Sequence, residues 1–179
     1  MKISKKHIFL FLIVATPVAI TFYLKDRKQV ARKLPIYGER FYDEQIKDTV
    51  YHTISPFKFI DQSGDTISEK DFENTIYIAS FFFASCPDIC PRVNKNLAYV
   101  YEKFKKSPEI KFISHTVHPE NDSVEVLAEY AKRYNANPEK WHFVTGRKSE
   151  LYRAIEFDYL AVKPVPEGET NFIHSDKVI

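Results

Sequence analysis

The two cysteines of the chain lie in one six-residue motif, CPDICP, at residues 86–91. If the motif is helical, the separation of four residues places the thiols of Cys86 and Cys90 on one face, with Cα atoms about 6 Å apart. That distance suits a disulfide, and two thiolates can also share one metal ion. The alternative is a structural disulfide or two inert thiols, but a disulfide that closes so short a loop constrains the unfolded chain little. The motif therefore predicts a dithiol that is reduced, oxidised or metal-bound.

The elements around the motif determine how the thiols are presented. Residues Ile76 to Phe83 (IYIASFFF) are β-branched or aromatic without alternation, which predicts a central strand buried on both faces. After Pro91, apolar side chains at helical spacing predict a helix, namely Val93, Leu97, Val100, Tyr101 and Phe104. The cysteines thus lie where a strand leads into a helix. Unpaired N–H groups at a helix N-terminus stabilise a thiolate and lower its pKa, above all at Cys86.

The remaining pattern predicts an α/β fold with parallel strand pairing. Asp122 followed by Glu125 forms a capping-box pattern before a helix whose apolar face is Val124, Leu127, Ala128 and Ala131. The other expected elements are a hairpin of Phe57 to Ile60 with Thr66 and Ile67, strands at Lys111 to Val117 and His142 to Val144, and a helix from Leu151 to about Phe157.

Composition and the N-terminal segment define the domain organisation. The 179 residues allow one domain of ordinary size, and a net charge of +2 is too small to indicate nucleic-acid binding. Residues Ile8 to Leu24 form a mostly apolar run with basic flanks, which predicts a single-pass signal anchor within residues 1–33. A cleavable signal peptide is the alternative, although no A-x-A site follows the run. Residues 34–51 are expected to be a tether, and residues 52–179 the globular domain.

Three segments resemble motifs of the SCO/SenC family. FFFASCPDICP resembles the family signature F-x-F-T-x-C-P-x-x-C-P, and the segments SHTVHPENDS and WHFVTG resemble S-x-T-V-D-P-E-x-D-T and W-x-F-L-T-G. The likeness runs from about Pro56 to Ile179. It implies a thioredoxin-like fold with a central, mostly parallel sheet flanked by helices. It also implies that copper, as Cu(I) or Cu(II), is bound by Cys86, Cys90 and the histidine of NFIHSDKVI, His174.

The resemblance further implies a copper metallochaperone that assists assembly of the CuA site in subunit II of cytochrome c oxidase. Such a protein is expected in the cytoplasmic (inner) membrane, with its globular domain on the periplasmic or outer side. Soft thiolates favour Cu(I), but zinc would accept the same ligands. A thiol-disulfide oxidoreductase that reduces partner cysteines, including those of CuA, is the main alternative. A copper or redox sensor is the third.

The sequence departs from the family pattern at two places. His118 stands where the family usually has an aspartate, so the role of that acid is in doubt; a second metal site at His115 and His118 is not favoured, because the strand geometry leaves them on opposite faces. Asp88 either tunes the site or is a solvent-exposed turn residue. The family normally continues beyond the histidine with a further strand and helix, so we expect either a fragment or a domain whose C-terminal strand and helix are missing.

Overall fold

The computed structural model describes residues 5–26, 35–162 and 178–179, and the chain divides into two units, residues 1–37 and 38–179. In the first unit, helix α1 (Lys5–Asp26) covers the apolar run and contains Pro17. Within the described ranges, we find no helix with the length and apolarity that a membrane crossing requires. The predicted signal anchor is therefore not shown and stays a prediction.

The second unit contains a five-stranded mixed sheet in the order β4-β3-β7-β6-β5. Three of its strands are parallel: β5 (Ile76–Phe82), β6 (Ile110–Thr116) and β7 (Trp141–Thr145). The hairpin of β3 (Lys58–Asp61) and β4 (Thr66–Ser68) joins β7 in antiparallel pairing, which makes the sheet mixed rather than mostly parallel. The α/β class and the predicted strands of the sheet are confirmed. The expected central position of β5 is wrong, because β5 lies at the edge of the five strands that the structure describes in this sheet.

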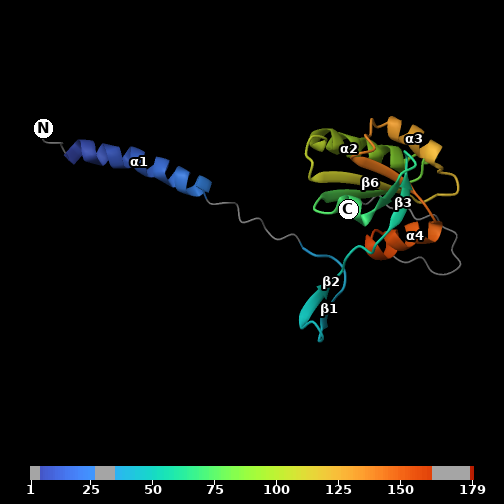
Figure 1. Cartoon of the computed structure of the whole chain (residues 1–179). Helices are drawn as coiled ribbons and strands as arrows, with labels where there is room; N and C mark the ends of the chain where they lie inside the picture. Colours follow the sequence, from blue (N-terminus) through green and yellow to red (C-terminus); the bar gives the residue numbers. More distant parts are fainter. Residues whose placement is uncertain (1–4, 27–34, 163–177) are drawn as a thin grey trace. The chain divides into compact units, whose positions relative to one another are not determined.

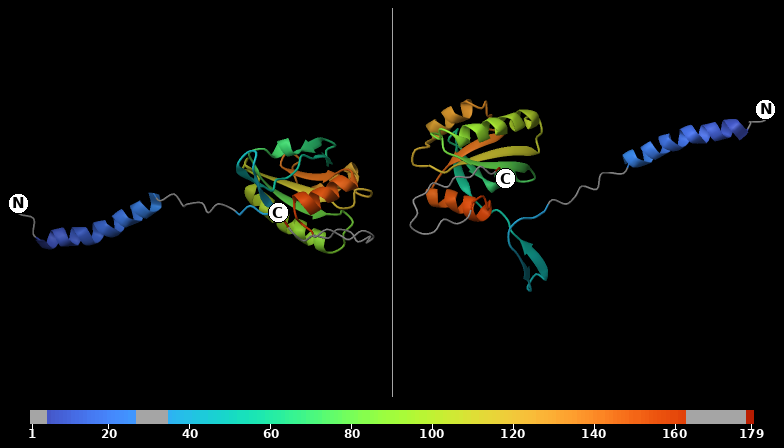
Figure 2. Two further views of the ribbon diagram at one scale, coloured as in Figure 1. Left: turned by 90° about the horizontal axis from the view of Figure 1, so that it is seen from below. Right: turned by 180° about the vertical axis from the view of Figure 1, so that it is seen from behind.

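Helices cover both faces of this sheet (Figure 1, Figure 2). Helices α2 (Ile89–Phe104) and α3 (Val124–Lys132) lie over one face, and α4 (Lys148–Arg153), continued by the π-helical turn η2 (Ala154–Asp158), lies over the other. The 3₁₀ turn η1 (Glu69–Phe72) follows β4. Burial on both faces explains why β5 is mostly apolar without alternation, whereas β6 also carries Lys111, Ser114 and His115.

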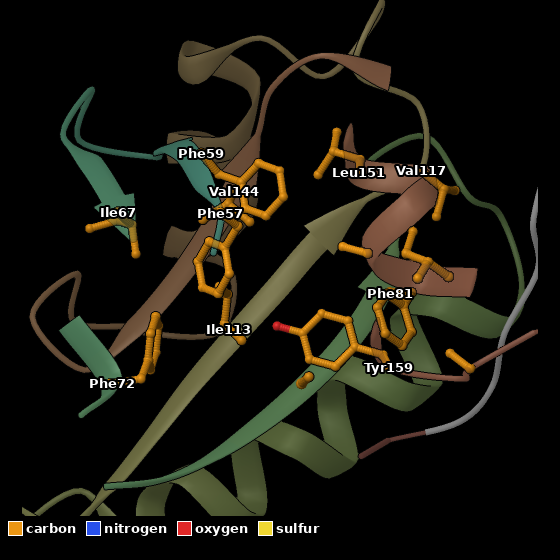
Figure 3. Packing of buried hydrophobic residues seen from close by; sticks show 14 residues of the cluster. Phe57, Phe59, Ile67, Phe72, Phe81, Ile113, Val117, Val144, Leu151 and Tyr159 are labelled. Carbon is orange, nitrogen blue, oxygen red and sulfur yellow. The ribbon is translucent and has the colours of Figure 1, made fainter. Parts of the chain in front are cut away.

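Each face has its own apolar cluster. Figure 3 shows Phe81, Ile113 and Val144 from the three parallel strands on the same side as Leu151 and Tyr159. On the opposite face, side chains of α2 and α3 pack on the strands around Trp141, and both cysteines belong to this second cluster. The dithiol is therefore part of the core on the α2 and α3 face.

Residues 34–51 contain an element that the sequence did not predict. Strands β1 (Arg40–Asp43) and β2 (Asp48–Tyr51) form a separate antiparallel hairpin in what was expected to be a tether. At its base, the Nε2 atom of His52 lies 2.7 Å from the Asp158 carbonyl oxygen, within hydrogen-bond distance. The expectation was wrong because the hairpin lacks the alternation of a half-buried strand; most of its side chains are exposed.

The outer edge of β5 is paired at one position. Ala79 and Ile179 exchange both backbone hydrogen bonds, at 2.6 and 2.9 Å, which is the arrangement of an antiparallel pair. Ile179 thus supplies the donor and the acceptor that Ala79 needs at this edge.

Candidate functional site

The structure places the two cysteines at the junction of β5 and α2, as the sequence predicted. Cys90 lies in the first turn of α2, and Cys86 lies in the preceding loop, three residues before the helix begins. The expected helical spacing is thus replaced by a loop-and-helix arrangement, yet the two thiols are hydrogen-bonded to each other. Both are reduced and buried, with 8% and 6% of their surface exposed.

The two thiols differ in acidity. Burial alone would raise the pKa of Cys86, but the backbone N–H groups of Cys90, Asp88 and Ile89, together with the Cys90 thiol, lower this pKa below its ordinary value. Burial raises the pKa of Cys90 to about 12, and the neighbouring Cys86 adds to the rise. The start of α2 therefore stabilises a thiolate at Cys86, and Cys90 stays protonated beside it.

A buried carboxylate supports the loop that carries Cys86. Asp122, with 1% of its surface exposed, accepts hydrogen bonds from the Ala84 N–H at 3.1 and 3.3 Å and from the Thr116 hydroxyl. The sequence assigned Asp122 as the cap of the next helix, and this was wrong. Ser123 is the cap and accepts from the Val126 N–H, because its side chain faces the helix while that of Asp122 turns inward. The only indication of this in the sequence is that Asp122 and Ser123, both of a type that caps helices, are adjacent.

The other predicted residues have separate environments. His118 follows β6, and its ring lies edge-on to that of Phe83, with 6.5 Å between the centroids. Asp88 is exposed at the start of α2, 3.7 Å from Arg92. His115 is fully buried on the α4 face, where its ring contacts that of Tyr159. His174 lies outside the described residues.

Within the described part of the chain, no three His, Cys, Asp or Glu side chains are grouped closely enough to hold a metal ion. The described residues therefore supply two donor atoms, the sulfurs of Cys86 and Cys90. Two adjacent thiols, one of them acidic, fit a soft metal ion as well as they fit disulfide exchange.

The fold and this junction define a class, the thioredoxin-like proteins with a buried dithiol between a parallel strand and a helix. The chain belongs to the SCO1/SenC family, whose model matches residues 46–179. A SCO1 protein homolog from Bacillus subtilis is 32% identical over 133 residues, which cover 73% of this chain and 69% of that protein. The chain spans about half the length (55%) of a SCO2-like protein from Rickettsia prowazekii, and the two are 30% identical over the matched residues.

Solved structures agree with the family. BsSco, described as a member of the Sco family of cytochrome c oxidase assembly proteins with a disulfide switch, is 30% identical with a TM-score of 0.58. The match covers 69% of this chain and 73% of BsSco. Copper-bound ScoI from Arabidopsis thaliana is also 30% identical, with a TM-score of 0.51 over 59% of this chain and 65% of that chain.

Proposed function

We propose that this SCO1/SenC protein carries copper, bound by Cys86, Cys90 and His174, and delivers it to the CuA site of cytochrome c oxidase subunit II. The observation that carries the proposal is the pair of hydrogen-bonded thiols of unequal acidity at the start of α2. Thiolates are soft ligands that favour Cu(I), and an imidazole added to them also accommodates Cu(II). Copper is the cargo of the protein in this proposal, so a site with few ligands suits its release.

The pair of Ala79 and Ile179 supports the choice of His174 as the third ligand. Ile179 pairs with β5, the strand that leads to the two cysteines. His174 precedes Ile179 by five residues in the sequence, and five residues span at most about 18 Å of extended chain.

The related proteins support the same reading at a coarser level. Copper is bound in the Arabidopsis ScoI structure, and BsSco is described as belonging to a family of cytochrome c oxidase assembly proteins. Copper binding and a role in oxidase assembly are the properties that we transfer to this chain as a proposal. The membrane location and the outer-side placement of the domain stay predictions from the sequence.

The ligand set is tested by replacing His174. The reduced full-length chain is titrated with Cu(I) in competition with a chromophoric chelator, and the His174→Ala and His118→Ala variants are compared. We expect His174→Ala to weaken copper binding by at least about tenfold, which corresponds to about 1.4 kcal/mol. His118→Ala is the matched control, because it removes an imidazole near the same loop. Unchanged affinity in His174→Ala would sink the three-ligand proposal.

Delivery is tested separately from binding. The copper-loaded chain is mixed with an apo CuA domain, and transfer is followed by the CuA absorption bands. We expect copper to move to the acceptor at equilibrium. If the chain binds copper tightly but does not pass it to the acceptor, the function of a copper sensor is favoured instead.

The unequal thiol acidities also favour a second function, reduction of a partner disulfide. The Cys86 thiolate attacks one sulfur of the partner disulfide and forms a mixed disulfide, and the first partner thiolate leaves. Cys90, after losing its proton, then attacks the Cys86 sulfur, which releases the second partner thiolate and leaves Cys86 and Cys90 oxidised to a disulfide. The dithiol itself supplies the two electrons. Rapid reduction of an oxidised CuA domain by metal-free His174→Ala would favour this function over copper transfer.

A further inference from the structure

We propose that Asp122 is a positioning residue of the dithiol, whose buried carboxylate holds the Ala84 segment so that Cys86 meets the first turn of α2. The inference deepens the proposed function and rests on it only in requiring that Cys86 react or bind as a thiolate. It concerns a residue that makes no contact with a metal or a substrate.

The carboxylate joins two segments that are distant in the sequence. Both oxygens of Asp122 lie within 3.3 Å of the Ala84 nitrogen, and one of them also accepts from the Thr116 hydroxyl at the end of β6. The oxygen of that hydroxyl in turn accepts from the His118 N–H at 2.9 Å. The loop after β6 is thereby tied to the loop after β5.

The segment from Phe82 to Cys86 is held at successive backbone positions. The Phe82 carbonyl accepts from the Val117 N–H at 2.8 Å, and the Cys86 N–H donates to the Phe83 carbonyl at 3.1 Å. The Ala84 N–H lies between these two bonds, and Asp122 is the acceptor that fixes it. If the Ala84 bond is lost, the loop two residues before Cys86 loses one of its three fixed backbone positions, and the place of Cys86 at the start of α2 is no longer fixed.

The use of an acid at this position needs a reason. None of the ion pairs found among residues 5–26, 35–162 and 178–179 includes Asp122, and a buried carboxylate without a cation is costly unless its oxygens are hydrogen-bonded. The hydrogen bonds that the carboxylate accepts from the Ala84 N–H and the Thr116 hydroxyl compensate for that cost.

Position and charge can be separated by two substitutions. Asp122→Asn keeps an acceptor in place and removes the negative charge. A negative charge by itself disfavours a nearby thiolate. Asp122→Glu keeps the charge and displaces the acceptor by one methylene. A positioning role therefore predicts that Asp122→Glu slows the reaction of Cys86, whereas a role of the charge alone predicts that Asp122→Asn speeds it and that Asp122→Glu leaves it unchanged.

The test measures the reaction of the reduced, metal-free full-length chain with the aromatic disulfide DTNB at neutral pH. We expect Asp122→Glu to slow the reaction at least about tenfold, because Cys86 loses thiolate-stabilising contacts. Asp122→Asn should react as fast as the unsubstituted protein or faster. Asp61→Glu is the matched control: Asp61 is 2% exposed and accepts the Ser63 and Asp65 N–H groups in the β3–β4 turn, away from the dithiol.

Three results would overturn the proposal: an unchanged rate in Asp122→Glu, equal slowing in Asp61→Glu, or slowing in Asp122→Asn as large as in Asp122→Glu. Circular dichroism establishes that each variant is folded. If the longer acid prevents folding, Thr116→Val replaces it, since this change removes a donor to the same carboxylate and should also slow the reaction. No copper is present, so failure of copper binding in the earlier titration leaves this result unaffected.

Discussion

At the scale of single residues, the site depends on two thiols that are chemically equivalent in the sequence and different in the fold. Backbone N–H groups at the start of α2 lower the pKa of Cys86. Cys90 lies within the first turn, where apolar side chains surround it and burial raises its pKa. The position of a helix terminus, rather than the identity of the residue, therefore decides which sulfur is the nucleophile.

This difference predicts selective alkylation. In the reduced protein at pH 7, iodoacetamide should modify Cys86 faster than Cys90 by about a hundredfold or more, because a thiol of higher pKa offers a far smaller thiolate fraction. The rate at Cys86 should reach half its maximum below pH 9, and the rate at Cys90 should still be rising at pH 11. Peptide mass spectrometry with timed quenching measures both rates. Equal rates at the two cysteines would contradict the assigned roles.

At the scale of elements, the sequence predicts best the strands and helices whose burial follows a regular pattern along the chain. β5 is mostly apolar because both faces of the sheet are covered, and α2 shows its apolar stripe because one face packs on the sheet. The cysteine pair was predictable for the same reason, since its place between a strand and a helix is local information. The β1–β2 hairpin was not predictable, because exposed strands have no periodic burial to leave in the sequence.

The role of Asp122 was also beyond prediction from the sequence. Its partner Ala84 is a backbone N–H on another element, and no side-chain pattern records such a bond. The pairing of Ile179 with Ala79 is of the same kind. Contacts through the backbone across distant segments are the part of this site that required the structure.

The hairpin gives a prediction at this scale. Gly38 has φ +95, and a Cβ at this position would lie 2.5 Å from the His52 Cβ, so Gly38→Ala should displace His52 from the Asp158 carbonyl. Because an isolated hairpin is marginal in water, hydrogen exchange of the β2 amides should accelerate. Gly64→Ala is the control, with φ +84 and no atom within 4 Å of its Cβ, and should leave β2 exchange unchanged. Unchanged exchange in Gly38→Ala would show that this base contact does not stabilise the hairpin.

At the scale of the whole molecule, each face of the sheet buries one group that couples the stability of the core to the solution. His115 couples it to pH on the α4 face, and the dithiol couples it to oxidation on the other face. On the α4 face, His115 is fully buried and enclosed by Phe59, Phe81 and Tyr159. Burial lowers the pKa of His115 to about 3. The folded protein therefore keeps this histidine neutral, whereas the unfolded chain protonates it below about pH 6.5.

It follows that the free energy of unfolding should fall as the pH drops from 6.5 towards 3, at up to about 1.4 kcal/mol per pH unit from this group. His115→Phe, which suits the aromatic surroundings, should remove that part of the slope and leave stability at pH 7 little changed. Urea unfolding followed by Trp141 fluorescence at several pH values measures the effect. The same slope in both proteins would show that His115 is not the group responsible.

The other face has a consequence for the chemistry of the sulfurs. Cys86 and Cys90 share an apolar cluster with Leu127, Tyr130 and Trp141, so the folding equilibrium and the oxidation equilibrium form one thermodynamic cycle. If oxidation of the pair strains this cluster, the strain lowers the stability of the oxidised protein and makes the dithiol a poorer electron donor by the same amount. Each 1.4 kcal/mol of such strain corresponds to about 30 mV in the two-electron potential. Packing around α3 can thereby set how readily this protein gives up its electrons.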